Sequence, residues 1–105
     1  MSWAKQAIED LANGANSVAV RPRGNSMHPK VKSGARVVVR PIADYGALEK
    51  GDIVLVTVKG RTYLHLIKGK RNSHGKLQFL IGNNKGGING WTNASNVHGI
   101  TAEIA

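Results

Sequence analysis

The chain has 105 residues, with 15 basic against 6 acidic side chains and a formal net charge of +9. This length fits one domain, and the absence of cysteine excludes disulfides and thiolate metal sites. The charge suits an acidic protein surface or a nucleic acid as partner, but it is equally typical of the solvated surface of a small basic protein.

The first fourteen residues predict a helix that runs from Ser2 to Asn13. Ser2 is a suitable N-cap, and Gly14 is a suitable C-terminal stop. The apolar residues recur at helical spacing and form one face, which we expect to pack on a sheet. They are Trp3, Ala7, Ile8 and Leu11.

The rest of the chain, residues 17–104, predicts a β core. Valine-rich or alternating segments separated by turn residues predict strands at 17–21, 35–40, 53–58, 61–67, 77–81 and 97–104. Residues 83–96 are dense in Gly and Asn and are predicted to form an irregular loop. Short strands with one N-terminal helix predict a small, mostly antiparallel β fold in a single domain, 1–105.

The sequence predicts neither membrane insertion nor a bound cofactor. No apolar run approaches the roughly 20 residues of a membrane span, and no N-terminal stretch has the apolar centre of a signal peptide. We therefore expect a soluble, cytoplasmic protein. Four scattered histidines without cysteines or paired carboxylates predict no metal site, and no phosphate-binding loop is present.

Two residues carry the chemistry that the sequence suggests. Ser26 lies in the turn-forming segment Gly24–Pro29, and His65 is the polar member of the apolar, strand-like run Thr62–Ile67. A serine hydroxyl becomes a useful nucleophile only when a base lies within hydrogen-bond reach. Taken alone, the serine would be a turn former and the histidine a buried, satisfied side chain.

Several segments, in order, resemble the boxes of the signal peptidase and LexA-like serine peptidases. Gly24-Asn25-Ser26-Met27-His28-Pro29, followed by the strand at 35–40, is similar to their nucleophile box. Lys50–Val56 resembles the second box, a Gly-Asp turn that leads into a strand. Tyr63–Gly69 resembles the third box, which carries the general base. Phe79–Asn84 and Val97–Ile100 resemble the closing turn and strand. The resemblance covers residues 23–100, most of the chain.

This resemblance implies a LexA/signal-peptidase-like catalytic fold and a set of roles. Ser26 would attack a peptide carbonyl, His65 would act as its base, and the backbone N–H of Ser26 or Met27 would stabilise the oxyanion. The substrate would lie as an extended strand along a sheet edge. Candidate residues of the substrate cleft are Asn25, Met27, His28 and Pro29.

The chain departs from the family pattern at two positions. Bacterial signal peptidases and LexA-like proteins have lysine where this chain has His65, and histidine is typical of the eukaryotic and archaeal signal peptidases. That branch also uses an aspartate in the closing turn, where this chain has Asn83. We therefore expect a Ser-His dyad whose imidazole is oriented by Asn83 or Asn84, with Ser26 Oγ and a His65 ring nitrogen about 2.6–3.2 Å apart.

Three functions remain open on the sequence. The leading one is a serine endopeptidase that acts on a peptide or protein substrate. The missing acid motivates a catalytically inactive module of the same fold that binds peptide or protein. The charge of +9 motivates nucleic-acid binding. Self-cleavage of the LexA kind is predicted to be absent, because the chain contains no Ala-Gly dipeptide and no cysteine. The oligomeric state stays open.

Overall fold

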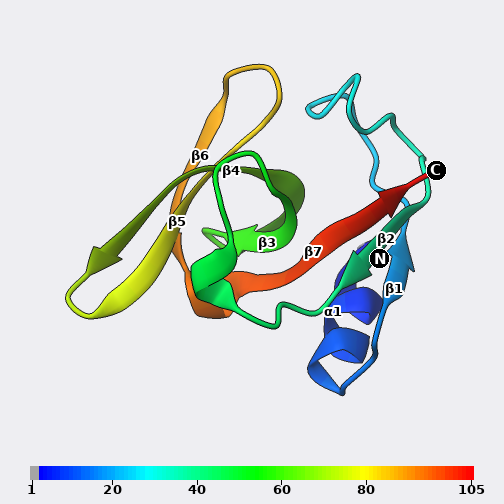
Figure 1. Cartoon of the computed structure of the whole chain (residues 1–105). Helices are drawn as coiled ribbons and strands as arrows, with labels where there is room; N and C mark the ends of the chain where they lie inside the picture. Colours follow the sequence, from blue (N-terminus) through cyan, green and yellow to red (C-terminus); the bar gives the residue numbers. More distant parts are fainter. Residues whose placement is uncertain (1–2) are drawn as a thin grey trace.

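The computed structural model describes residues 3–105, which form one α-helix and one seven-stranded antiparallel sheet. The elements are α1 (Lys5–Ala12), β1 (Val18–Val20), β2 (Val37–Arg40), a 3-10 turn η1 (Tyr45–Ala47), β3 (Ile53–Val58), β4 (Arg61–Ser73), β5 (Lys76–Gly82), β6 (Ile88–Asn93), a second 3-10 turn η2 (Ala94–Asn96) and β7 (Val97–Ile104). The strand order is β1-β2-β7-β3-β4-β5-β6 (Figure 1). The predicted mostly antiparallel fold with one N-terminal helix is confirmed.

The helix is shorter than predicted. It begins at Lys5 with Ala4 as its N-cap, whereas the predicted N-cap, Ser2, lies outside the described residues. Gly14 ends it with a positive φ of 95° and an N–H that donates to the Leu11 carbonyl, as expected of a glycine at this position. The predicted apolar face does pack on the sheet, through Trp3, Ala7, Ile8 and Leu11. None of the helices in the described part of the chain has the length and apolar character that crossing a bilayer requires.

The prediction of an irregular loop over residues 83–96 is wrong. Most of this segment is the edge strand β6 followed by η2. Gly and Asn are poor strand formers, and the sequence of β6 carries little apolar alternation. Pairing decides the conformation instead, since Phe79 lies opposite Thr92 and Ile81 opposite Gly90 in the β5–β6 ladder.

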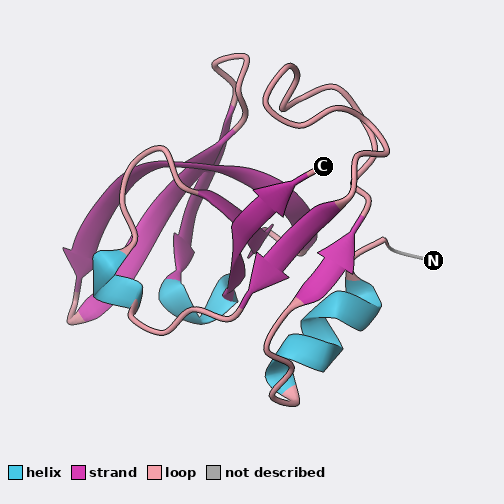
Figure 2. Cartoon of the chain, turned by 45° about the vertical axis from the view of Figure 1, so that its right-hand side comes forward, coloured by secondary structure: helices cyan, strands magenta, loops and turns pink. Residues whose placement is uncertain are grey.

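Two apolar cores lie on the two faces of the sheet. One lies between α1 and the sheet and includes Val37, Val39, Leu55 and Leu64. The other lies inside the curl formed by the later strands and includes Val54, Val56, Ile67, Phe79 and Ile81. The curl brings β6 back towards β3, since the Thr92 hydroxyl donates to the Thr57 carbonyl at 2.9 Å. Figures 1 and 2 show the helix beside β1 and β2, away from the β4–β5 hairpin and β6.

The first half of β4 has a free edge. Residues 61–66 pair with β3, but β5 joins the other side of β4 only from Leu66 onward. The backbone N–H and C=O of Ile67 bond towards the β3 side, to Asp52 and Gly51. Since these groups alternate in direction along a strand, those of Thr62 and Leu64 face the free edge. This stretch can therefore accept another strand.

A close approach between β7 and β2 requires a glycine at position 99. A Cβ at Gly99 would lie 2.5 Å from Val39 Cγ1 and 2.7 Å from the backbone oxygen of Arg40. Gly69, in β4, provides the contrast, because a Cβ there would meet only ordinary contacts of 3.6 Å from Leu80 and Trp91. The two strand glycines thus differ in the space around them.

We predict that Gly99→Ala lowers the free energy of unfolding by about 1–3 kcal/mol, because the new methyl group overpacks the β2–β7 contact. Gly69→Ala should change it by less than about 0.5 kcal/mol. Urea unfolding followed by circular dichroism measures both. Equal stabilities for the two variants would contradict the close approach described above.

Candidate active site

Ser26 lies in a turn of the long connection between β1 and β2, and buried neighbours hold this turn in place. Its neighbour Met27 and the following Val31 are buried in the core beneath α1. The Val31 N–H donates to the Met27 carbonyl at 3.0 Å, and the His28 N–H donates to the Asn25 carbonyl at 3.1 Å. Burial of Met27 and Val31 therefore fixes the turn, while Ser26 stays half-buried at its surface.

A second loop holds the serine turn from the side. The Asn84 N–H donates to the Ser26 carbonyl at 2.9 Å, and the Asn84 side-chain amide donates to the His28 carbonyl at 3.2 Å. Asn83 closes its own loop, since its side-chain oxygen accepts from the N–H groups of Lys85 and Gly87, each at 2.8 Å. Neither asparagine hydrogen-bonds to the imidazole, whose ring nitrogens meet Ser26 and Asn89, so the expectation that Asn83 or Asn84 orients His65 is wrong.

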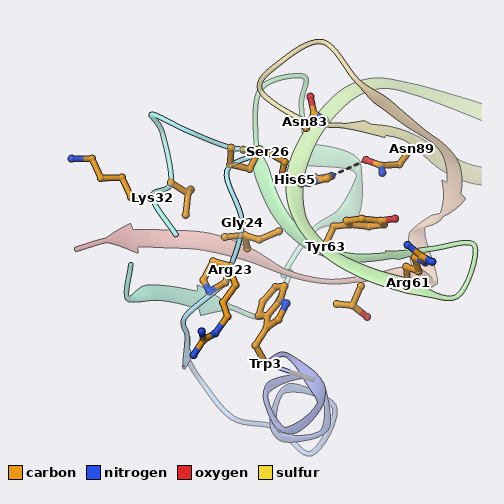
Figure 3. Close-up of a pocket in the computed structure, with 15 residues that line it drawn as sticks. Trp3, Arg23, Gly24, Ser26, Lys32, Arg61, Tyr63, His65, Asn83 and Asn89 are labelled. Carbon is orange, nitrogen blue, oxygen red and sulfur yellow. Dashed lines mark hydrogen bonds between the residues drawn. The ribbon is translucent and has the colours of Figure 1, made fainter. Parts of the chain in front are cut away.

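His65 joins Ser26 to a third residue. Its Nε2 lies 3.0 Å from Ser26 Oγ, within the expected range, and its Nδ1 lies 2.7 Å from Asn89 Oδ1. The histidine comes from β4 and the asparagine from β6, and their contact can be followed in Figure 3. The arrangement is therefore a Ser-His-Asn relay.

Asn89 is not among the predicted site residues, because its segment was expected to form an irregular loop. The β4–β5 and β5–β6 registers place Leu66, Gly82 and Ile88 in one row across three strands. Asn89 is the extra residue of the bulge between the Ile81–Gly90 and Gly82–Ile88 pairs, and its side-chain oxygen reaches His65 from there. Asn89 could have been predicted as a partner of His65 only if β6 had been predicted as a strand paired with β5.

The hydrogen bonds define the state of the imidazole. An amide oxygen only accepts, so Nδ1 of His65 carries the proton and donates it to Asn89 Oδ1. In the neutral ring Nε2 is then the acceptor, and the Ser26 hydroxyl donates to it. This is the tautomer that a general base acting on the serine requires.

Burial favours the uncharged form of the His65 ring. His65 is only 5% exposed, and the Tyr63 ring stacks on it with a centroid separation of 4.6 Å and an interplanar angle of 22°. Loss of solvation lowers the pKa of His65 below the ordinary value of 6.5, and the hydrogen bond to Asn89 offsets part of this effect. At neutral pH the ring is therefore uncharged and able to accept a proton.

Two backbone donors point to where negative charge could be stabilised. Within residues 3–105, the N–H groups of Ser26 and Met27 have no hydrogen-bond acceptor. Unused N–H groups at a nucleophile are the usual components of an oxyanion hole. The expected oxyanion role of Ser26 and Met27 is thus compatible with the turn.

A cleft of about 600 Å³ opens beside the relay and runs along the free edge of β4. Its walls come from Trp3 before α1, from the serine turn, from β4 and from Asn89 (Figure 3). Of the four residues predicted to form the cleft, Met27 lines it, whereas Asn25, His28 and Pro29 do not. Those three are exposed on the outer side of the turn, because burial of Met27 sets the direction of the whole segment.

Comparison with known proteins identifies one family. The family described as Peptidase S24-like matches residues 2–85, which include Ser26 and His65 but end before Asn89. No curated protein and no solved structure gives a significant match. The resemblance to LexA-like peptidases inferred from the motifs is confirmed at the level of the family.

The burial of two histidines predicts a pH dependence of stability. Desolvation lowers the pKa of His98, as it does that of His65, and His98 Nε2 lies 2.8 Å from Thr57 Oγ1. Below about pH 6.5 the unfolded chain binds protons that the folded protein still excludes. The free energy of unfolding should therefore decrease as the pH falls from about 7.5 to 5.5.

Urea titrations at both pH values measure this decrease. The double variant His65→Gln, His98→Gln should show a shallower dependence, whatever its absolute stability. An unchanged slope in the double variant would contradict the assignment.

Proposed function

The chain belongs to the peptidase S24-like family, and we propose that it acts as a serine endopeptidase that cleaves an extended peptide. The observation that carries the proposal is the 3.0 Å contact between Ser26 Oγ and His65 Nε2. Residues far apart in the sequence meet there in the geometry of a nucleophile and its base. A turn former and a structural histidine would have no reason to meet at an open cleft.

The chemistry follows from the protonation state of the relay. His65 Nε2 takes the hydroxyl proton as Ser26 Oγ bonds to the substrate's carbonyl carbon, and the carbonyl oxygen becomes an anion. The N–H groups of Ser26 and Met27 would stabilise this oxyanion. When the tetrahedral adduct collapses, the C–N bond breaks and His65 gives its proton to the leaving amine. A water molecule, deprotonated by the same nitrogen, then hydrolyses the acyl-enzyme.

The free edge of β4 supports an extended substrate. The outward N–H and C=O groups of Thr62 and Leu64 can pair with a peptide backbone and add a strand to the sheet. The cleft lies along this edge and ends at the catalytic pair. Backbone pairing would hold the peptide, and the side-chain subsites would select it.

Asn89 supports catalysis as a positioning residue. Its side-chain oxygen holds the Nδ1–H tautomer and the orientation of His65. It is neutral, however, and so cannot balance the imidazolium charge as an aspartate does. This neutrality favours one second candidate, a module of the same fold that binds peptide in the cleft without cleaving it.

A fluorophosphonate probe distinguishes the two candidates. If the relay is active, the probe should phosphonylate Ser26, whereas Ser26→Ala should not react. His65→Gln should react roughly 10²–10⁴-fold more slowly. Mass spectrometry of the labelled peptide gives the site. Labelling at Ser26 that is equally fast in His65→Gln, or none in the wild type, would remove the general-base mechanism.

Substitutions at Asn89 test the positioning role through the pH profile. The wild-type labelling rate should rise with pH through a midpoint below 6.5, because burial lowers the pKa of His65. Asn89→Asp should move this midpoint upward, because a carboxylate stabilises the imidazolium. Asn89→Leu should move it downward and slow the reaction on the order of fivefold, as expected for one lost neutral hydrogen bond. Identical midpoints in all three proteins would show that Asn89 does not act on the imidazole.

A further inference from the structure

The charged residues that line the cleft are all positive. Arg23, Lys32 and Arg61 line it, and no acidic residue of the described chain does. The six acidic residues lie elsewhere, on α1, in the turns around η1 and β3, and near the end of β7. They are Glu9, Asp10, Asp44, Glu49, Asp52 and Glu103. The net charge of +9 is therefore not evenly distributed, and the cleft has a positive potential.

The two arginines of the cleft are free to bind a ligand. Within residues 3–105 neither the Arg23 nor the Arg61 guanidinium has a hydrogen-bond or ion-pair partner. Some basic residues outside the cleft are engaged by the protein itself. Arg71 donates to Gln78 and lies over the Trp91 ring, and Lys70 donates to the carbonyls of the η1 turn. Unengaged guanidinium groups suit recognition of carboxylates.

The positions of these arginines match an extended peptide. Arg61 lies four residues before His65 on β4, about 13 Å along the strand, and alternation places it on the same face as His65. Figure 3 shows Arg23 beside Trp3 on one wall of the cleft and Arg61 on the other side, beyond Tyr63. If the scissile bond of an extended peptide lies at Ser26, a peptide side chain several residues from that bond therefore lies within reach of an arginine.

The surface near Ser26 is apolar. Trp3, Met27, Val31 and Leu64 line the same cleft, and the last three are almost fully buried. Such a wall accommodates an apolar side chain close to the scissile bond.

We infer that the substrate of this site is an acidic peptide, with an apolar residue next to the scissile bond and Asp or Glu several residues away. This inference rests on the proposed function for the identity of the site, but the selectivity itself is a property of binding. A peptide fits better than a nucleic acid, because the free edge of β4 offers paired N–H and C=O groups to a polypeptide backbone. The face of the Tyr63 ring that stacks on His65 is, moreover, not available to stack on a nucleic-acid base.

The test measures binding to Ser26→Ala, so that it does not depend on catalysis. Two short peptides share the central sequence Ala-Leu-Ala-Ala and carry on each flank either two aspartates or two lysines. Calorimetric titration should give at least about tenfold tighter binding of the acidic peptide, the sum of several weak exposed ion pairs. The preference should shrink as the salt concentration rises from about 50 to 500 mM.

A matched pair of variants separates the cleft from the net charge. Arg61→Glu and Lys76→Glu change the charge equally, but Lys76 lies in β5 and does not line the cleft. In the Ser26→Ala background, Arg61→Glu should abolish most of the acidic preference, and Lys76→Glu should leave it nearly intact. Equal losses in both variants, or equal affinities for the two peptides, would overturn the inference.

A short oligothymidylate serves as the competing polyanion. Weaker binding than the acidic peptide supports the inference, and tighter binding that Arg61→Glu abolishes would overturn it in favour of a nucleic acid. The two proposals fail in different ways. Fluorophosphonate labelling of Ser26 without acidic selectivity leaves the peptidase and removes this inference. Acidic selectivity without labelling leaves a binding cleft and removes the peptidase.

Discussion

The hydrogen bond from His65 Nδ1–H to Asn89 Oδ1 is the interaction on which the site depends. A neutral imidazole has one donor and one acceptor, so the atom that engages the donor decides where the acceptor points. Here β6 supplies that atom, and the acceptor faces Ser26. Burial then keeps the ring uncharged at neutral pH. In the proposed mechanism, tautomer, orientation and protonation state together suit this side chain, in the middle of a strand, to act as the base.

The rest of the fold serves to bring a loop-borne hydroxyl to this ring. Met27 and Val31 tie the serine turn to the core beneath α1, while the Asn84 loop holds it from the β5–β6 side. Ser26 thus lies against His65, next to the point where β4 loses its pairing with β5. The same loss of pairing leaves the edge that a substrate strand would occupy. In the proposed mechanism, the position of the nucleophile and the access of the substrate therefore have one structural origin.

Local patterns predicted the strands that have strong apolar character and missed what pairing decides. The bounds of β3 and β7 were predicted as observed, and the Ser26–His65 contact followed from resemblance to a family. β6 could not be read from its Gly- and Asn-rich sequence, because its conformation comes from the ladder with β5. That ladder includes a bulge near Gly82, and it selects Asn89 rather than Asn83 as the partner of His65. Contacts between side chains on strands that are separated by another strand depend on register, which is difficult to predict from a single sequence.

The tautomer of His65 tests this account most directly. Nitrogen-15 NMR of the ring, recorded at a pH above its pKa and assigned with His65→Gln, distinguishes a protonated from an unprotonated nitrogen. The account predicts a proton on Nδ1 and an unprotonated Nε2, with the reverse populated in Asn89→Leu. A proton on Nε2 in the wild type would contradict it, because the imidazole would then donate to Ser26 and could not activate it.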